Sequence, residues 1–179
     1  MATSTDSSKA AATLLINKES VSAALQNDKG KDALLKSFEI IDFLAPGEGY
    51  LGSLTSVKVL YSLEDEEEKS TSYVVKLNGG GDENHDASQK VFFAKEATIL
   101  YQFLPLMNKI LEEHNQRPLC IPICYYASLD PGKEILFMQD MRVRKFTKIK
   151  DELGIDVNHT KVIIQELARL HAAFVLLEK

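Results

Sequence analysis

Apolar and polar residues alternate along several short stretches of the chain, whereas other stretches repeat their apolar residues every three or four positions. Alternation with a period of two is typical of a strand, and the longer spacing is typical of an amphipathic helix. The alternating stretches predict strands over residues 34–44, 52–63, 70–77, 119–129 and 134–141. The helical pattern predicts helices over residues 17–26, 89–104 and 158–177. The predicted fold class is therefore α+β, with a five-stranded antiparallel sheet and a long helix packed on it.

The helix predicted over residues 89–104 has the clearest apolar stripe in the chain. We expect this stripe to face the sheet and to contain Val91, Phe92, Ile99, Leu100 and Phe103. Pro105 fits the first turn of a continuation that ends near Glu113, because the first turn of a helix does not use its backbone N–H groups.

Composition narrows the class of protein. The 179 residues are 45% hydrophobic and 26% charged, which is enough apolar material for one domain with a core. The net charge of −5 argues against a nucleic-acid-binding surface, and the acidic run from Glu64 to Glu68 predicts a solvated loop. The sequence has neither a signal peptide nor an apolar run of about 18 residues, so we expect a cytoplasmic protein that does not enter the membrane. Cys120 and Cys124 have no second pair and no nearby histidine, and we expect buried, reduced thiols rather than zinc ligands.

Three glycines with the spacing Gly47-x-Gly49-x-x-Gly52 are the first candidate for chemistry. This spacing occurs in dinucleotide-binding turns and in the phosphate-covering loop of kinases, and it also occurs in flexible hairpin turns. A dinucleotide turn is followed by a helix, whose N-terminus holds the pyrophosphate. Residues 54–59 instead alternate and predict a strand, which excludes the dinucleotide turn. A hairpin turn and a kinase loop both remain.

Two charged residues in apolar surroundings favour the kinase loop. Lys76 lies within a predicted strand, on the same face as Val74. Glu96 lies four residues after Phe92 and three before Ile99, beside the predicted buried stripe. An isolated buried charge is costly, so we predict that Lys76 and Glu96 form an ion pair. In a kinase such a pair directs the lysine to the phosphates of ATP, and a purely structural salt bridge is the alternative.

The apolar strand that ends at Met138-Gln139-Asp140-Met141 adds a weaker indication. An apolar strand that ends in a short polar step is typical of the segment between the two lobes of a kinase, where backbone groups bond to adenine. An ordinary edge strand leading into a loop fits the same pattern.

Taken together, several stretches resemble the ecdysteroid kinase-like family, which is related to choline and aminoglycoside kinases. They are GEGYLGSLTSVKVLY, YVVKLN, FFAKEATILYQFLP, PICYYA, ILFMQDM and LGIDVNHTKVIIQELARLHAAF. The resemblance implies ATP and Mg²⁺ as cofactors and a small-molecule alcohol, such as an ecdysteroid, as substrate. It also implies that the nucleotide is bound by Gly47, Gly49, Gly52, Ser53, Val74, Lys76, Glu96, Met138, Gln139, Asp140 and Met141.

The resemblance also implies how the chain is divided into segments and which catalytic residues the chain lacks. It implies a kinase-like N-terminal lobe over residues 17–141 and a connector with the first helix of a second lobe over 142–179, and the small, polar residues at the start of the chain predict a disordered N-terminus over 1–16. Such kinases take their catalytic base from a His-Gly-Asp type loop and hold Mg²⁺ with a further aspartate. None of the four histidines is followed by Gly-Asp, so we expect a truncated chain with no catalytic residue. A non-catalytic nucleotide-binding or interaction remnant is the alternative.

In a truncated chain the last helix would lack its partner lobe. Its predicted apolar stripe, which contains Val162, Leu170, Phe174 and Leu177, would then be exposed and open to association with another protein.

Overall fold

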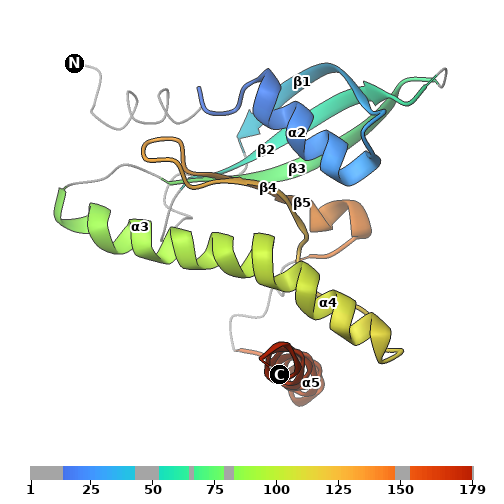
Figure 1. Ribbon diagram of the computed structural model, residues 1–179, viewed down its shortest axis with the longest axis vertical. Helices are drawn as coiled ribbons and strands as arrows, with labels where there is room; N and C mark the ends of the chain where they lie inside the picture. Colours follow the sequence, from blue (N-terminus) through green and yellow to red (C-terminus); the bar gives the residue numbers. More distant parts are fainter. Residues whose placement is uncertain (1–13, 43–52, 65–66, 79–82, 148–153, 179) are drawn as a thin grey trace.

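Five antiparallel strands form a single sheet in the computed structural model, which describes residues 14–42, 53–64, 67–78, 83–147 and 154–178 (Figure 1). The strand order is β1-β2-β3-β5-β4. The strands are β1 (Leu34–Asp42), β2 (Ser53–Ser62), β3 (Lys69–Leu77), β4 (Cys124–Ser128) and β5 (Ile135–Gln139). The predicted α+β class and its five-stranded antiparallel sheet are confirmed.

The fourth strand is shorter than predicted, because the stretch before it contains Pro122. Proline has no backbone N–H to donate to a neighbouring strand, and β4 begins only at Cys124. The predicted turn between β4 and β5 is present: the N–H of Lys133 donates to the carbonyl of Asp130 at 2.8 Å, and Gly132 adopts a φ of 77°. Glu67 and Glu68, at the end of the acidic run, are exposed before β3.

One face of the sheet is covered by α2 (Lys18–Lys29), as Figure 1 shows. Asn17 caps this helix by accepting from the N–H of Ser20 at 3.0 Å, and the Ser20 hydroxyl accepts from the N–H of Asn17 at 3.1 Å. The core on this face contains Val21, Leu25, Val57, Val59, Tyr73, Val75 and Phe137. Ile16, the last residue of the predicted N-terminal segment, packs in the same core with 4% of its surface exposed.

The opposite face is covered by one long helix with an irregular middle. It consists of α3 (Glu83–Ala97), a π-helical turn η1 (Thr98–Phe103) and α4 (Leu104–Glu113). The predicted continuation through Pro105 is confirmed, and the helix starts earlier than the predicted residue 89. The predicted stripe was wrong in part: Phe92 is 54% exposed and Ile99 is 49% exposed, whereas Phe93 and Ala97 are buried against the sheet and the predicted Leu100 packs beside them.

The π-helical turn redirects the apolar face of this helix. In an uninterrupted α-helix, residues 93, 97, 100, 104, 107 and 111 would share one face. The N–H of Leu104 bonds to the carbonyl of Ile99, five residues earlier, so η1 contains one residue more than an α-helical turn. One extra residue rotates the following helix by about 100°. Leu104, Met107 and Leu111 therefore pack on α5 (Val157–Leu177) instead of on the sheet (Figure 1).

The last helix is attached to the long helix along part of its surface. Ala173 is buried, Leu170 and Leu177 are partly buried, and the rings of Phe103 and Phe174 meet edge to face with centroids 6.1 Å apart. The predicted exposed stripe is thus only partly exposed, because two of its members lie against α4. Val162 remains 63% exposed.

A carboxylate at the side of α5 fixes the position of this helix. Glu166 accepts from Arg117 Nη2 at 2.6 Å, from Arg169 Nη1 at 3.0 Å and from the N–H of Cys120 at 2.5 Å. Burial opposes ionisation of this carboxyl, but the hydrogen bonds outweigh it and lower the pKa of Glu166. Cys120 is exposed, contrary to the prediction, because its segment lies at the surface between α4 and α5; Cys124 is buried, and both thiols are free.

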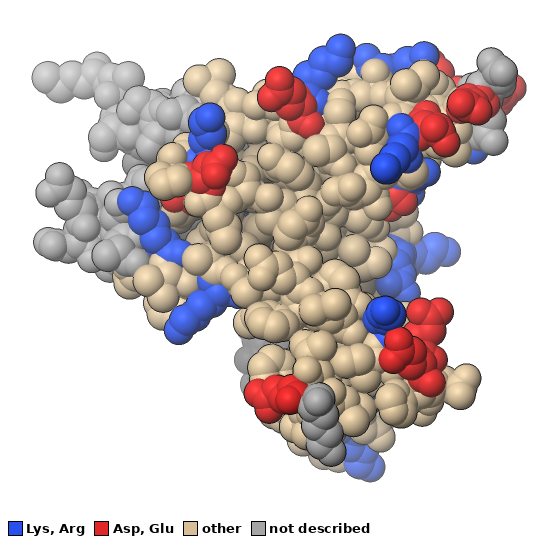
Figure 2. Space-filling view, in the orientation of Figure 1, with Lys and Arg blue, Asp and Glu red and all other residues tan. Residues whose placement is uncertain are grey.

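Charged side chains of both signs lie on the face of the molecule that Figure 2 shows. Figure 2 shows Lys and Arg interspersed with Asp and Glu around a broad uncharged area on this face of the molecule. Among the helices that the structure describes, none has the length and apolar character required to cross a membrane.

Candidate functional site

The predicted contact between Lys76 and Glu96 is present. The Nζ atom of Lys76 donates to Oε2 of Glu96, across the interface between β3 and α3. The Lys76 side chain is 15% exposed and that of Glu96 is 36% exposed. Both charges are thus partly withdrawn from water, and the pair lies at the edge of the apolar layer between sheet and helix.

The sheet register explains how a lysine is accommodated there. Along β3 the buried residues are Tyr73, Val75 and Leu77, which face α2, whereas Val74 and Lys76 face the long helix. Lys76 pairs with Leu54 on β2 and with Leu136 on β5. Its apolar stem can lie along these leucines while the ammonium reaches the helix.

Glu96 reaches Lys76 for a reason that differs in part from the predicted one. It lies three residues after the buried Phe93 and four before the partly buried Leu100, so it borders the stripe that packs on the sheet. The sequence prediction placed it beside Phe92 and Ile99, which are exposed. Because Glu96 is adjacent to either possible stripe, the ion pair was predicted correctly although part of the stripe was not.

The predicted glycine loop with Gly47, Gly49 and Gly52 lies outside the described residues. The strands on each side of it are described: β1 ends at Asp42 and β2 begins at Ser53. Ser53 pairs with Leu77, directly beside the pairing of Leu54 with Lys76. Both ends of the segment that carries the glycines are therefore at the same end of the sheet as Lys76.

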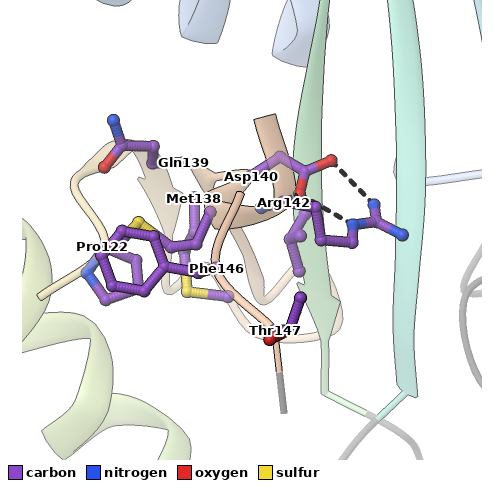
Figure 3. Close-up of a pocket in the computed structure, with 9 residues that line it drawn as sticks. Pro122, Met138, Gln139, Asp140, Arg142, Phe146 and Thr147 are labelled. Carbon is purple, nitrogen blue, oxygen red and sulfur yellow. Dashed lines mark hydrogen bonds and ion pairs between the residues drawn. The ribbon is translucent and has the colours of Figure 1, made fainter. Parts of the chain in front are cut away.

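A pocket of about 270 Å³ lies on the same face of the sheet, at the end of β5 (Figure 3). The predicted residues Val74, Met138, Gln139, Asp140 and Met141 all line this pocket. Pro122, Arg142, Phe146 and Thr147, which were not predicted, complete it. Val74 and Lys76 are two positions apart on one face of β3, which places the pocket and the ion pair roughly 7 Å apart along the strand.

Asp140 connects the pocket to the sheet through a network of hydrogen bonds. Its buried carboxylate accepts from Ser72 Oγ at 2.7 Å and from Arg142 Nε at 2.8 Å, and it also accepts from the N–H of Arg142 at 3.0 Å. Burial opposes ionisation, but the bonds from Arg142 and Ser72 outweigh it and lower the pKa of Asp140. The carboxylate oxygens are thus occupied in holding the turn after β5.

At the end of β5, the backbone N–H of Gln139 is not available to a ligand in the pocket. The N–H of Gln139 donates to the carbonyl of Ile123 at 2.7 Å. The side chain of Gln139 points away from Pro122 and Phe146 in Figure 3, and its buried Oε1 has no hydrogen-bond partner. Gln139 therefore lines the pocket, and its backbone N–H is already bonded within the protein.

The fit to the two expected cofactors differs. An apolar pocket in line with a paired lysine suits the base and the phosphates of a nucleotide. A Mg²⁺ ion needs several oxygen ligands, and the residues that the structure describes contain no group of three or more His, Cys, Asp and Glu side chains that could hold a metal ion. The described residues therefore suit the base and the phosphates of a nucleotide, and they contain no metal site of three or more protein ligands.

The sequence profile of the ecdysteroid kinase-like family matches residues 46–179, more than half of the chain. The chain belongs to the ecdysteroid kinase-like family. No curated protein and no solved structure matches it. In this ecdysteroid kinase-like chain, the five-stranded sheet with its long helix corresponds to the N-terminal lobe of a kinase, and the family indicates a kinase-like phosphotransferase.

Sequence reasoning missed the part of the pocket that follows Met141. Phe146 and Thr147 approach the pocket because the chain turns back after a short 3₁₀-helix, η2 (Met141–Arg144). Asp140 at the N-cap position was the available signal for η2, since aspartate there often accepts from the following N–H groups. Nothing in the residue pattern indicated the direction in which the chain leaves this helix.

Proposed function

We propose that this chain binds ATP on the face of the sheet that carries Lys76, as the nucleotide-holding part of a small-molecule kinase. The observation that carries this proposal is the alignment of two features on one strand. The pocket at Val74 and the ion pair of Lys76 with Glu96 follow each other along the same face of β3.

Each feature has a role in this proposal. The adenine lies in the apolar pocket between Val74 and Met138, beside the backbone of residues 139–141. The phosphates extend towards Lys76, whose ammonium neutralises part of their charge. Glu96 orients that ammonium, and the segment with Gly47, Gly49 and Gly52 begins and ends where the phosphates would lie.

The proposed activity of these residues is nucleotide binding. Phosphoryl transfer also needs a base for the acceptor hydroxyl, and no histidine in the 179 residues begins a His-Gly-Asp loop. The proposed acceptor, a small-molecule alcohol such as an ecdysteroid, and the proposed location in the cytoplasm rest on family membership and on the sequence.

Isothermal titration calorimetry with ATP tests the proposal. We expect saturable binding by the wild-type chain, and affinity lower by on the order of tenfold to a hundredfold in Lys76→Met, the usual range for a lost charged hydrogen bond. Lys58→Met is the matched control, because Lys58 is an exposed lysine of β2 that pairs with Ser72 on the same sheet face. No binding by the wild-type chain, or equal binding by Lys76→Met, would disprove the proposal.

Association through α5 is a second candidate function. Val162, Ile163 and Ile164 are exposed by 50% or more on this helix. Contiguous exposed apolar side chains favour contact with another protein. Light scattering would show this as self-association that Ile163→Glu reduces, and a monodisperse wild-type monomer would contradict self-association.

A further inference from the structure

Phe146 borders the pocket on the connector that follows β5, on a segment to which sequence analysis assigned no role. We propose that Phe146 is the base-stacking residue of the nucleotide site and sets its preference for a purine nucleotide over bare phosphates. This inference rests on the proposed ATP-binding function and adds a specific contact to it. Of the described residues that line the pocket, Phe146 alone is aromatic. In Figure 3 its ring lies beside Pro122 and Met138.

A tight turn returns Phe146 to the pocket. Asp140 caps η2 by accepting from the N–H of Arg142, and Lys145 then adopts a left-handed conformation with a φ of 63°. The N–H of Phe146 donates to the carbonyl of Met141 at 3.1 Å. A left-handed non-glycine residue is uncommon and costs free energy, so surrounding contacts must hold it in place. The turn therefore has a defined geometry, which fixes the position of the Phe146 ring.

Side-chain contacts join this turn to the sheet. Ser72 on β3 donates to Asp140, and Arg142 Nη2 donates to the hydroxyl of Ser56 on β2 at 2.5 Å. Arg142 also donates from Nη2 to Asp140 Oδ2 at 2.7 Å, one of the contacts between these residues in Figure 3. The sheet and the connector that carries Phe146 are thus linked directly across the end of the pocket. A base between them would meet surfaces whose separation is already set.

The ring is suited to take a base because part of it is uncovered. Phe146 is 43% exposed, and the guanidinium carbon of Arg144 lies over the ring, 5.5 Å from its centroid. An exposed aromatic ring beside an apolar pocket gains contact area when a flat base covers it. Base stacking on an aromatic side chain contributes on the order of fivefold to a hundredfold in affinity.

The composition of the chain permits a direct test. It contains no tryptophan, so Phe146→Trp places one fluorophore at the proposed stacking position. We expect ATP to change the fluorescence of this tryptophan with a saturable dependence on concentration. Inorganic tripolyphosphate, which has no base, should bind near Lys76 with little change in that fluorescence. If calorimetry shows that ATP binds to this variant and the fluorescence stays constant, the inference is wrong.

Truncation of the ring supplies an independent measurement. We expect Phe146→Ala to bind ATP on the order of tenfold more weakly than the wild type and to bind tripolyphosphate equally well. Phe146→Tyr should retain ATP affinity, and Val143→Ala is the matched control because Val143 lies in the same turn and is 68% exposed. Equal ATP affinity of the wild type and Phe146→Ala overturns this inference alone. A wild-type chain that binds neither ligand overturns the proposed function together with it.

Discussion

Lys76 on β3 donates to Glu96 on α3, and this pair joins the centre of the sheet to the helix that covers it. Both side chains border apolar residues, and neither is fully buried. The pair therefore contributes to two properties: attachment of the helix to the sheet and the direction of the lysine. Separate measurements can distinguish these contributions.

A double-mutant cycle with Lys76→Met and Glu96→Gln measures the first contribution. We expect a coupling energy of about 1 kcal/mol in urea unfolding, since the Glu96 carboxylate is 36% exposed and exposed ion pairs contribute little. Glu96→Gln alone should also weaken ATP binding, by less than Lys76→Met does, because the lysine remains charged but loses its orientation. Zero coupling would show that the two side chains do not interact in solution.

Deletion of Gln102 tests the role of the π-helical turn. Without Gln102, Leu104 would follow Phe93 by ten positions instead of eleven, so an uninterrupted α-helix would direct it about 80° away from the stripe of Phe93 and Ala97, much as the π-helical turn does. The sheet and α5 can then both stay packed, and we expect the unfolding free energy to change by less than about 1 kcal/mol. Limited proteolysis should cut α5 no earlier in this variant than in the wild type.

The matched control for that deletion is Gln102→Ala. Gln102 is exposed, so replacing it without a change of length should alter stability by less than about 0.5 kcal/mol. A deletion variant much less stable than the control would mean that packing of the sheet and α5 requires the extra residue of the π-helical turn.

The same turn shows where sequence prediction reached its limit. The strands were predicted well because successive residues of each strand face opposite sides of the sheet. One side packs on α2 and the other on α3, so the residue pattern has a period of two. Phe92 and Phe93 are adjacent, so the sequence permits two stripes on the long helix, and only the tertiary partners select one. Residues 98–103 have no composition that indicates a π-helix.

In the candidate site, too, some residues could be predicted from the sequence and others could not. Val74, Lys76 and Glu96 were found because charge inside an apolar pattern is informative and because family motifs occur in order along the chain. Phe146 was missed because its position depends on the left-handed Lys145 and on contacts of Asp140 with Ser72, far away in sequence. Such long-range contacts leave no local periodicity.

The two cysteines should differ in reactivity. Burial raises the pKa of Cys124 to about 12, whereas Cys120 is exposed. Because the thiolate is the reactive form, a thiol reagent at pH 8 should label Cys120 quickly and Cys124 only after unfolding. Mass spectrometry of the labelled chain, with Cys120→Ser as the control, measures this; rapid labelling of Cys124 in the folded chain would contradict its burial.

Cys124 should also make the fold sensitive to alkaline pH. Its folded pKa lies above the unfolded value of about 8.5, so its stabilising contribution is complete below that pH and is lost as the pH rises towards 12. Cys124→Ala should therefore lose less stability than the wild type between pH 8 and 10, as measured by urea unfolding. Equal losses in the two proteins would show that this thiol is not responsible.

Acid pH should release α5 through Glu166. The folded pKa of this carboxyl is lowered, so its contribution is present above the unfolded value of about 4.3 and is lost as the pH falls through the folded value. Glu166→Gln removes the charge that Arg117 and Arg169 share, and we expect about 2 kcal/mol lower stability at pH 7 with a flatter dependence of stability on pH below pH 5.

The control for this prediction is Glu112→Gln, because Glu112 is an exposed residue of α4. Since Asp140 and Asp156 also have lowered pKa values, some acid sensitivity should remain in Glu166→Gln. An acid transition identical to that of the wild type would show that Glu166 does not hold α5 through its charge.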